Sequence, residues 1–296
     1  VFNGLTMGTY IDQPDFVYVD DDYANATPGW GYDHFSSIQA GIDAVNISGT
    51  VFVYNGTYQE QINVTKSVVL QGENNVSTIV IGGFNVSQDN TTIKNFNITH
   101  GYRFISEEIN MILTGIYSNS SNNTIDNNNI WNITDITVQN ATGIFLENSE
   151  FNMISYNKIS YIFGGSGSND SNGGYGIGIK FKSSSCDTLL QNFINNISGG
   201  RGDDRGFTAS DGGYGIGIYL YSSSDCNFTQ NTFQNITGGN GGNGEFAGDG
   251  GYGIGVFLSS SVDSNFSLNI IQNVSGGKTG SGHAYNGGLG MGVYLL

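Results

Sequence analysis

Short apolar strands recur along the C-terminal half of the chain at a nearly constant interval. The motif Gly174-Tyr175-Gly176-Ile177-Gly178-Ile179 returns in closely similar form from Gly213, from Gly251 and from Gly288. A second short alternating strand follows in each unit, and runs of Asn, Ser and Gly separate the strands. Strands that repeat at a fixed period without helical periodicity predict a solenoid whose coils are turns of parallel β-sheet.

Aligning the units brings like residues into columns. One expected inward column holds Ile159, Ile194, Phe233 and Ile271, and the other holds the pairs Ile144 and Leu146, Ile179 and Phe181, Ile218 and Leu220, and Val256 and Leu258. A polar column holds Asn128, Asn157, Asn192, Asn231 and Asn269. Because stacked Asn side chains can hydrogen-bond to one another and Asn tolerates a left-handed backbone, we interpret this column as a structural ladder at a coil corner.

One stretch near the N-terminus has a helical pattern. Phe35, Ile38, Ile42 and Val45 share one stripe, with Asp33 or Ser36 as an N-cap. An amphipathic helix over 35–45 is expected to cover the first coil, whose open edge would otherwise pair with other chains. Residues 1–32 are then an N-terminal opening segment, and 33–296 are the solenoid.

Four Gly-rich inserts interrupt the C-terminal units, at 164–174, 199–213, 238–251 and 276–288. Strict alternation along the motif that follows each insert places its glycines on the outside of the strand. The glycines concerned are Gly176, Gly178, Gly215, Gly217, Gly253, Gly255, Gly290 and Gly292. A strand without outward side chains lets another backbone approach, so we expect the inserts to lie against this face as a flap, with a neighbouring molecule as the alternative.

Composition narrows the possible partners. The 296 residues include 25 acidic and 9 basic side chains, a net charge of −16, which disfavours nucleic acid and anionic lipid. No run of 18 apolar residues is present, so no membrane insertion is expected. The chain begins at Val1 without a charged and apolar leader, which suits a mature secreted form or an excised fragment.

Glycosylation acceptor motifs, Asn-x-Ser or Asn-x-Thr, are about three times as frequent as random order predicts. They begin at Asn25, Asn46, Asn55, Asn63, Asn75, Asn85, Asn90, Asn97, Asn119, Asn122, Asn132, Asn140, Asn169, Asn196, Asn227, Asn235, Asn265 and Asn273. A repeated structural motif accounts for part of the enrichment. We interpret the rest as export and N-glycosylation, which predicts an extracellular or cell-surface location.

The two cysteines, Cys186 and Cys226, fall at nearly the same corner of adjacent coils, one position out of register. Adjacent coils bring Cα atoms within disulfide reach, and a secreted protein would oxidise the pair. Two interpretations therefore stay open: a disulfide between Cys186 and Cys226, or two buried thiols.

Candidate metal-binding residues are few. Gly199-Gly200-Arg201-Gly202-Asp203-Asp204 fits one copy of a calcium-binding repeat, but such sites need tandem copies. Asp203 and Asp204, like the run from Asp20 to Asp22, remain weak calcium candidates, and no metal or cofactor is expected.

Catalytic residues are also hard to identify. Asp187, Asp225 and Asp263 follow serine triplets at turns, and Glu147 and Glu150 lie one coil earlier, yet no acid and base residues are seen to converge. The sequence therefore predicts that the chain is not an enzyme.

An outward column of aromatic residues is a candidate binding surface. It holds Tyr117, Phe145, Tyr219, Phe257 and Tyr294, and is interrupted by Lys180. Such a column stacks on sugar rings or on a neighbouring molecule, unless the inserts roof it.

The region from Val17 to Tyr58 carries a resemblance to a known family. Val17-Tyr18-Val19-Asp20-Asp21-Asp22-Tyr23, the helix around Phe35 to Ile42, and Gly49-Thr50-Val51-Phe52-Val53-Tyr54 resemble the opening of pectin-lyase-like parallel β-helix proteins of the archaeal and bacterial surface type. The resemblance implies an all-β, right-handed, single-stranded parallel β-helix with a short capping helix and Gly-rich inserts. Its activity is left open, since such folds serve lyases, hydrolases, tailspikes and adhesins.

These observations lead to a functional hypothesis with one alternative. We predict an extracellular structural protein, a subunit of a surface layer, sheath or filament, whose partners are copies of itself joined through the coil ends. The alternative is a polysaccharide-active enzyme, lyase or glycoside hydrolase, or a carbohydrate-binding adhesin, using the aromatic column with Glu147 or Lys180.

Overall fold

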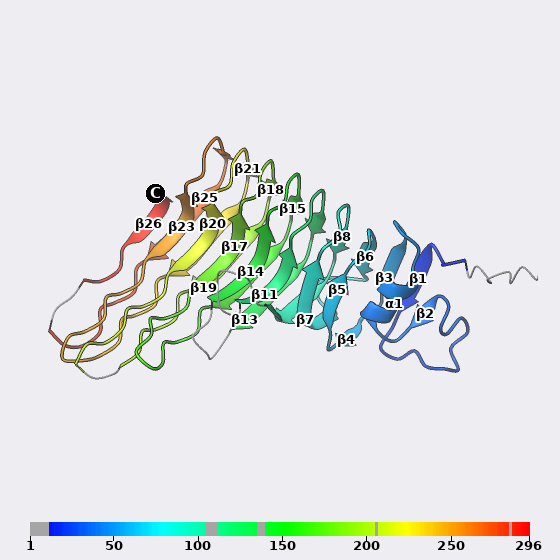
Figure 1. Cartoon of the computed structure of the whole chain (residues 1–296), viewed down its shortest axis with the longest axis horizontal. Helices are drawn as coiled ribbons and strands as arrows, with labels where there is room; N and C mark the ends of the chain where they lie inside the picture. The colour runs from blue at the N-terminus through cyan, green and yellow to red at the C-terminus, as the bar shows by residue number, and fades with distance from the viewer. Residues whose placement is uncertain (1–11, 105–111, 135–139, 205–206, 284–285) are drawn as a thin grey trace, which may run out of the picture.

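The chain is a right-handed parallel β-helix, as predicted, with one short helix near its N-terminal end (Figure 1). The computed structural model describes residues 12–104, 112–134, 140–204, 207–283 and 286–296. Its strands stack coil upon coil into a rod, and the pectin-lyase-like architecture expected from the sequence is confirmed.

The first sheet forms one side of the rod. Its 10 strands, in order across the sheet, are β2 (His34–Phe35), β1 (Phe16–Val19), β3 (Thr50–Val53), β6 (Val69–Gly72), β8 (Thr92–Lys94), β12 (Thr124–Asp126), β15 (Met153–Ser155), β18 (Thr188–Leu190), β21 (Asn227–Thr229) and β24 (Asn265–Ser267). Because β1 pairs in parallel with β3, the solenoid begins at Phe16, within the opening segment.

The other two sheets share one long strand, β7 (Thr78–Val86), and together contain 16 strands. The second sheet adds β4 (Gly56–Tyr58), β9 (Asn97–His100), β13 (Asn129–Thr134), β16 (Lys158–Phe163), β19 (Phe193–Ser198), β22 (Thr232–Thr237) and β25 (Ile270–Ser275). The third adds β5 (Gln61–Val64), β10 (Tyr102–Phe104), β11 (Ile112–Ser118), β14 (Asn140–Glu147), β17 (Gly176–Lys182), β20 (Gly215–Tyr221), β23 (Gly253–Ser259) and β26 (Gly290–Leu295). Among the described strands, β10 alone pairs antiparallel, with β11.

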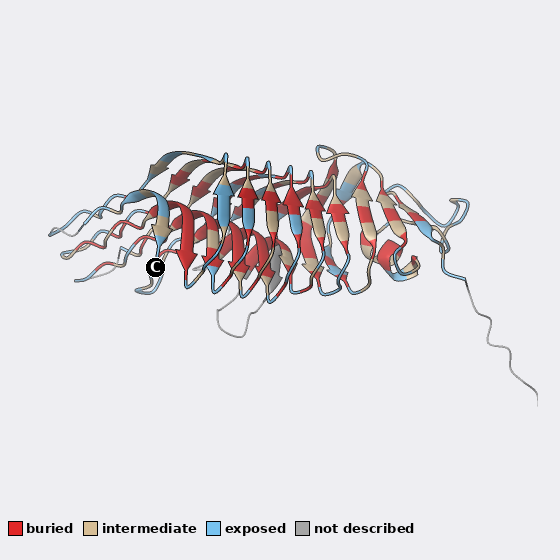
Figure 2. Cartoon of the chain, turned by 90° about the horizontal axis from the view of Figure 1, so that it is seen from above, coloured by how far each residue is buried: buried red, intermediate tan, exposed pale blue. Residues whose placement is uncertain are grey.

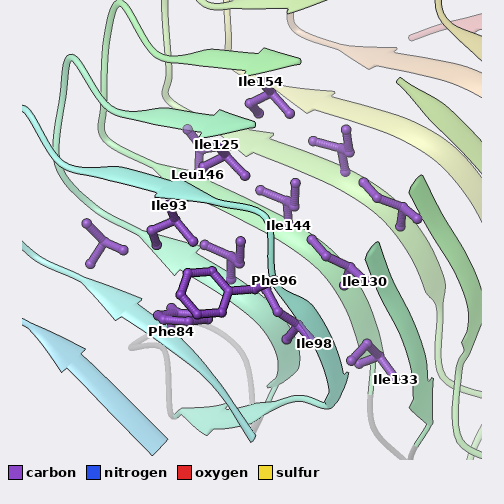
Figure 3. Packing of buried hydrophobic residues seen from close by; sticks show 14 of the residues in the cluster. Phe84, Ile93, Phe96, Ile98, Ile125, Ile130, Ile133, Ile144, Leu146 and Ile154 are labelled. Carbon is purple, nitrogen blue, oxygen red and sulfur yellow. The ribbon is translucent and has the colours of Figure 1, made fainter. Parts of the chain in front are cut away.

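The apolar columns fill the interior of the rod. Ile159, Ile194 and Phe233 are paired in register on successive strands of the second sheet and are fully buried. Figure 3 shows side chains from facing sheets meeting along the axis, and Figure 2 shows the buried positions running through the rod. The core is therefore one continuous stack rather than a central cluster.

The helix α1 (Ile38–Ala44) is shorter than the sequence pattern indicates. Its N-cap is Ser37, not Asp33 or Ser36, and the Ser37 hydroxyl accepts the Ala40 N–H. The Glu60 carboxylate, from a distant loop, accepts the Ile38 and Gln39 N–H groups at 2.8 and 2.9 Å, which satisfies two further amides of the first turn. The predicted start at residue 35 is wrong because Phe35 pairs in β2 instead.

The predicted outward glycine face does not exist, because the in–out alternation of each motif breaks at its central glycine. In β17, Ile177 pairs with Ile216 and Ile179 with Ile218; Gly178 and the equivalent Gly217 are both left out of the pairing, and the register is the same on either side of them. A Cβ atom on Gly178 would lie 2.6 Å from Ile194 Cγ2, so this glycine faces the core and makes room for the isoleucine wall. Ile179 also faces the core, whereas Ile177 belongs to a separate outer cluster.

The inserts form an ordered layer of their own instead of a flap against that strand. In each insert an outgoing arm and a returning arm exchange backbone hydrogen bonds with each other and with the next insert. The chain of N–H to O=C bonds runs Gly174 to Gly165, Gly200 to Gly174, Gly213 to Gly200, Gly239 to Gly213, Gly251 to Gly239, Gly277 to Gly251 and Gly288 to Gly277. In Figure 1 these inserts are the long loops beside the C-terminal coils. In the described part of the inserts the pairing is limited to isolated bridges, Thr208 with Phe246 and Phe246 with His283, and the hydrogen bonds between arms satisfy the glycine groups named above.

The polar column forms a buried ladder of amides. Asn128, Asn157 and Asn192 each donate from Nδ2 to the Oδ1 of the next asparagine at 3.0–3.1 Å, and Asn231 donates in the same way to Asn269. The left-handed residues are those immediately before the ladder, such as Asn127 and Gln191, rather than the ladder asparagines. The ladder thus ties the corners of five coils together.

Candidate functional site

The outer face of the third sheet carries the aromatic column in an unbroken register. Tyr117 pairs with Phe145, Phe145 with Lys180, Lys180 with Tyr219, Tyr219 with Phe257 and Phe257 with Tyr294. The Tyr219 and Phe257 rings stack at 4.8 Å with 6° between their planes. The sequence therefore placed these side chains on one face, and the strand spacing makes them a ladder of rings.

Lys180 continues this column rather than interrupting it. Its ammonium lies over the Phe145 ring at 4.7 Å from the centroid and 5.8 Å from the centroid of Tyr219. Lys180 is only 7% exposed, and cation–π attraction from both rings offsets part of the cost of that burial.

An ion pair lies two residues further along β14 and β17, beyond Phe145 and Lys180. Lys182 Nζ is 3.0 Å from Glu147 Oε1, and the Tyr117 hydroxyl donates to Glu147 Oε2 at 2.9 Å. Burial, together with the neighbouring Glu147, raises the pKa of Tyr117, so this phenol keeps its proton. The site thus contains a carboxylate, a phenol that donates a hydrogen bond to it, and two ammonium groups.

A groove of about 210 Å³ opens beside these residues. It is lined by Asn140, Tyr175, Ile177, Lys180, Lys182, Tyr219 and Tyr221. Tyr175, from the end of the first insert, stacks on Tyr214 at 4.9 Å and 1°, and Tyr214 stacks on Tyr252 at 5.0 Å. These rings cover the outward Ile177, Ile216 and Ile254, so the inserts roof one edge of the face and leave the groove open. The volume suits one flat ring on an aromatic floor more than an enclosed ligand.

The break in alternation at Gly178 explains why sequence reasoning missed part of this site. Strict alternation put Ile177 in the core, so the roof formed by Tyr175 and the neighbouring groove could not be foreseen. Lys182 lies two residues after Lys180 on the same strand, so alternation alone predicts that both side chains point to the same face. The pairing of Lys182 with Glu147 depends on register across two coils separated by an insert.

The weak metal candidates lie elsewhere. Asp204 pairs with Arg201, which holds the pKa of that carboxyl below its usual range, and Asp203 accepts the Asp170 and Asp204 N–H groups. Within the described ranges, the one group of three carboxylates with ligand spacing is Asp20, Asp21 and Asp22, of which Asp21 and Asp22 are exposed. Calcium at either place stays a prediction.

The disulfide that the sequence left open is not formed, and both thiols are free. Thr188 pairs with Asn227, so Cys226 lies opposite Asp187 and the two cysteines remain one position out of register. Cys226 faces the core, whereas Cys186 lies on a left-handed corner and is partly exposed. Asp225 and Asp263 occupy the same left-handed corner column as Cys186, and Asp187, unlike them, is buried.

The acceptor motifs differ in accessibility, which gives a prediction for Asn97. Its Nδ2 donates to Val76 O at 2.8 Å and its Oδ1 accepts the Trp131 Nε1–H at 2.6 Å, with the residue 8% exposed. After expression in a glycosylating host, the folded protein should therefore carry no glycan at Asn97. Peptide mass spectrometry with isotope-labelled deglycosylation measures this, with the exposed Asn119 as the reference site, and a glycan on Asn97 in folded material would contradict it.

No described helix in this chain has the length and apolar character needed to cross a membrane.

Comparisons with known proteins concern the fold. No family model matches the sequence, and no curated protein matches it either. Among solved structures, the Escherichia coli protein YbhC is 13% identical, with a TM-score of 0.40 over 90% of this chain and 76% of that one. Alginate lyase from Paenibacillus sp. is 12% identical, with a TM-score of 0.37 over 79% and 94%. Pectin methylesterase PemA from Erwinia chrysanthemi is 10% identical, with a TM-score of 0.36 over 88% and 81%.

One functional expectation changes with these comparisons. The sequence predicted that the chain is not an enzyme, and the similar structures, which include pectin methylesterases and an alginate lyase, overturn that prediction. At such low identity the likeness concerns architecture, so substrate and chemistry have to be argued from the residues of this chain.

Proposed function

We propose that the chain is an extracellular polysaccharide-active protein that binds an acidic polysaccharide on the outer face of the third sheet. The observation that carries the proposal is the placement of Lys180 and Lys182 on one strand of this face, with Lys180 between the rings of Phe145 and Tyr219 and Lys182 between Glu147 and Tyr221. Aromatic rings stack on the apolar faces of sugars, and ammonium groups attract the carboxylate or sulfate groups of an acidic sugar. The similar pectin methylesterases and alginate lyase are compatible with this substrate class.

Electrostatics support an anionic ligand at this place. The chain has 9 basic side chains against 25 acidic ones, and two of the nine lie on this face. The net charge of −16 disfavours anions on the surface in general, so Lys180, together with Lys182 whose charge Glu147 partly compensates, defines where an acidic chain can dock.

Glu147 and Tyr117 give the site the means for proton transfer. Glu147 lies between the Tyr117 hydroxyl and the Lys182 ammonium, within hydrogen-bond distance of both. A carboxylate held next to the binding face can remove a proton from a bound sugar, and a protonated phenol can supply one to a leaving oxygen. The proposed chemistry is therefore acid–base cleavage or elimination on the bound polymer.

A binding measurement tests the ligand class. Changing Lys180 and Lys182 together to Gln should weaken binding of alginate or polygalacturonate at least about tenfold, because both ammonium groups are lost. Changing Lys158, an exposed lysine on the second sheet, to Gln is the matched control and should leave the affinity unchanged. Equal losses in both variants, or equal binding of a neutral glucan by the unmutated protein, would refute an acidic ligand at this face.

A turnover measurement tests the chemistry separately. Glu147→Gln should slow release of new chain ends from the same polymers at least about a hundredfold while binding is retained, since proton transfer contributes about that factor. Glu150→Gln, an exposed residue of the same coil, should have full activity. Unchanged turnover in Glu147→Gln would remove this carboxylate from the mechanism, and binding without turnover in the unmutated protein would favour a carbohydrate-binding adhesin.

Assembly through the coil ends stays a separate proposal. The last described coil exposes Leu268, Leu289 and Leu295, each by 60% or more of its surface. Burial of these side chains between copies of the chain would favour association. Light scattering over a range of concentrations tests the proposal, which predicts a rising molar mass that is lost in a variant with Leu268 and Leu295 changed to Ser, and a constant monomer mass would exclude it.

A further inference from the structure

Asp187 occupies a position that belongs to a second buried ladder of amides. Thr91 N–H donates to Asn123 Oδ1, Asn123 N–H to Asn152 Oδ1, and Asn152 N–H to Asp187 Oδ1, at 2.8–3.0 Å. Asp187 therefore takes the place of the next asparagine in this column. It is fully buried.

The presence of an acid instead of an amide leaves one atom without a partner. In the preceding coils, Asn123 Nδ2 donates to Ser120 Oγ and Asn152 Nδ2 donates to Ser149 Oγ. The corresponding atom here is Asp187 Oδ2, which has no hydrogen-bond partner. The serine three residues before it is Ser184, whose hydroxyl lies 3.2 Å from that of Ser149. The Ser184 hydroxyl also donates to Lys182 O at 3.3 Å, so it is not a partner of Oδ2. A proton on Oδ2 would restore at this position the donor that Asn123 and Asn152 have in the preceding coils.

The ionisable groups around Asp187 do not favour its charged form. Glu150 lies on the preceding coil, Cys186 is adjacent in sequence, and Asp225 and Cys226 lie on the following coil. Lys182, at the end of β17 and five residues before Asp187, is paired with Glu147. Burial raises the pKa of Asp187 to about 7; the two hydrogen bonds that Oδ1 accepts from Asn152 N–H and Nδ2 oppose this rise, and the nearby Glu150 adds to it.

We propose that Asp187 is a proton-dependent lock on the corner formed by residues 183–187, closed when the buried carboxyl is protonated and released when it ionises. The protonated acid acts as an asparagine in the ladder. The ionised acid leaves a buried charge with an unpartnered oxygen, and opening of the corner brings that oxygen to water. This inference does not depend on the proposed function.

The direction of the pH dependence follows from the sign of the shift. The closed corner binds the proton more tightly than the open corner, whose carboxyl has the ordinary pKa of 3.8. The closed state is therefore favoured fully below about pH 4, loses stability as the pH rises from about 4 to about 7, and changes little above that. A difference of about three pKa units corresponds to a population of open corners that grows by up to about a thousandfold.

Cys226 is a built-in reporter of this opening. It is 1% exposed, lies opposite Asp187, and Asn227 N–H donates to Asp187 O across the same pair of strands. In a Cys186→Ser background Cys226 is the single thiol of the chain. Its labelling by 4,4′-dithiodipyridine, at reagent concentrations where reclosing outpaces labelling, measures the open population.

The test adds Asp187→Asn to the Cys186→Ser background, so that the two proteins differ only in whether this position carries an acid or an amide. The labelling rate of the protein with Asp187, divided by that of the protein with Asn at this position, should be near one at about pH 4 and at least about ten at about pH 8. Each rate is first divided by the labelling rate of the same protein unfolded in urea at the same pH, which removes the intrinsic pH dependence of the thiol. A ratio that stays within about twofold of one across this range would overturn the proposal.

A second measurement covers the case in which Asp187→Asn does not fold. Amide hydrogen exchange of residues 183–190 in the unmutated chain, corrected for intrinsic rates, should lose protection between about pH 4 and pH 7. The equivalent corner of the next coil, 222–229, has Cys226 in place of the acid and serves as the internal reference. Equal loss of protection at both corners would assign the change to the whole molecule and contradict a lock at Asp187.

Discussion

Replacing Asn192 by alanine is expected to lower the free energy of unfolding by about 3–5 kcal/mol. Asn192 Oδ1 accepts both the N–H of Asn157 at 3.0 Å and its Nδ2 at 3.1 Å, while its own Nδ2 donates to Ile154 O at 2.8 Å and Asn231 Oδ1 at 3.0 Å. The residue is 1% exposed, so water cannot replace these bonds. Two donors of Asn157 and one carbonyl would remain buried and unpartnered, each costing about 1–3 kcal/mol.

The control for this change lies on the same coil. Asn195 is on the outer face of β19 and accepts one hydrogen bond from Asn235 Nδ2, at 2.8 Å. Asn195→Ala should cost less than about 1 kcal/mol, because solvent can replace the lost partner. Urea unfolding followed by circular dichroism measures both variants, and similar losses in the two would mean that the ladder contributes no more than a surface amide.

The architecture could be predicted because the apolar and asparagine positions that produce it repeat in every coil of the sequence. A period that returns in every coil places Ile159, Ile194 and Phe233 in one column whatever the length of the insert between them. The aromatic column was found for the same reason. Parallel, in-register stacking converts equivalent positions in the units directly into neighbours in space.

The errors arose where the backbone departs from strict alternation or where partners are remote in sequence. The alternation breaks at Gly178, which leaves Ile177 outside the core, and parity counting cannot detect such a break because the pairing register stays constant on both sides of it. The helix start depends on Glu60, which lies beyond the next two strands, β3 and β4. The chemistry of the site depends on Glu147 meeting Lys182 and Tyr117 across three coils, which no local pattern encodes.

Gly239→Ala is expected to disrupt the glycine layer and to cost at least about 3 kcal/mol, the upper part of the range for overpacking. Gly239 lies between arms of neighbouring inserts, where its N–H donates to Gly213 O and its own carbonyl accepts the Gly251 N–H, each at 2.8 Å. A Cβ atom there would lie 1.8 Å from Gly200 O and 2.6 Å from Gly200 C. Relief requires a backbone to move, and that backbone is tied by the same chain of hydrogen bonds to the inserts on either side.

Because the layer is separate from the core, the loss should appear first as local opening of the inserts. Limited proteolysis should cut within 238–251 at least about tenfold faster in Gly239→Ala than in the unmutated chain, before the coils unfold. Gly287→Ala is the matched control, since a Cβ atom at that position has only Gly277 O nearby, at 3.6 Å, and cleavage should not change. If both variants resist cleavage equally, the backbones of adjacent arms are not in close contact. The close approach of these arms would then not explain why the inserts contain so many glycines.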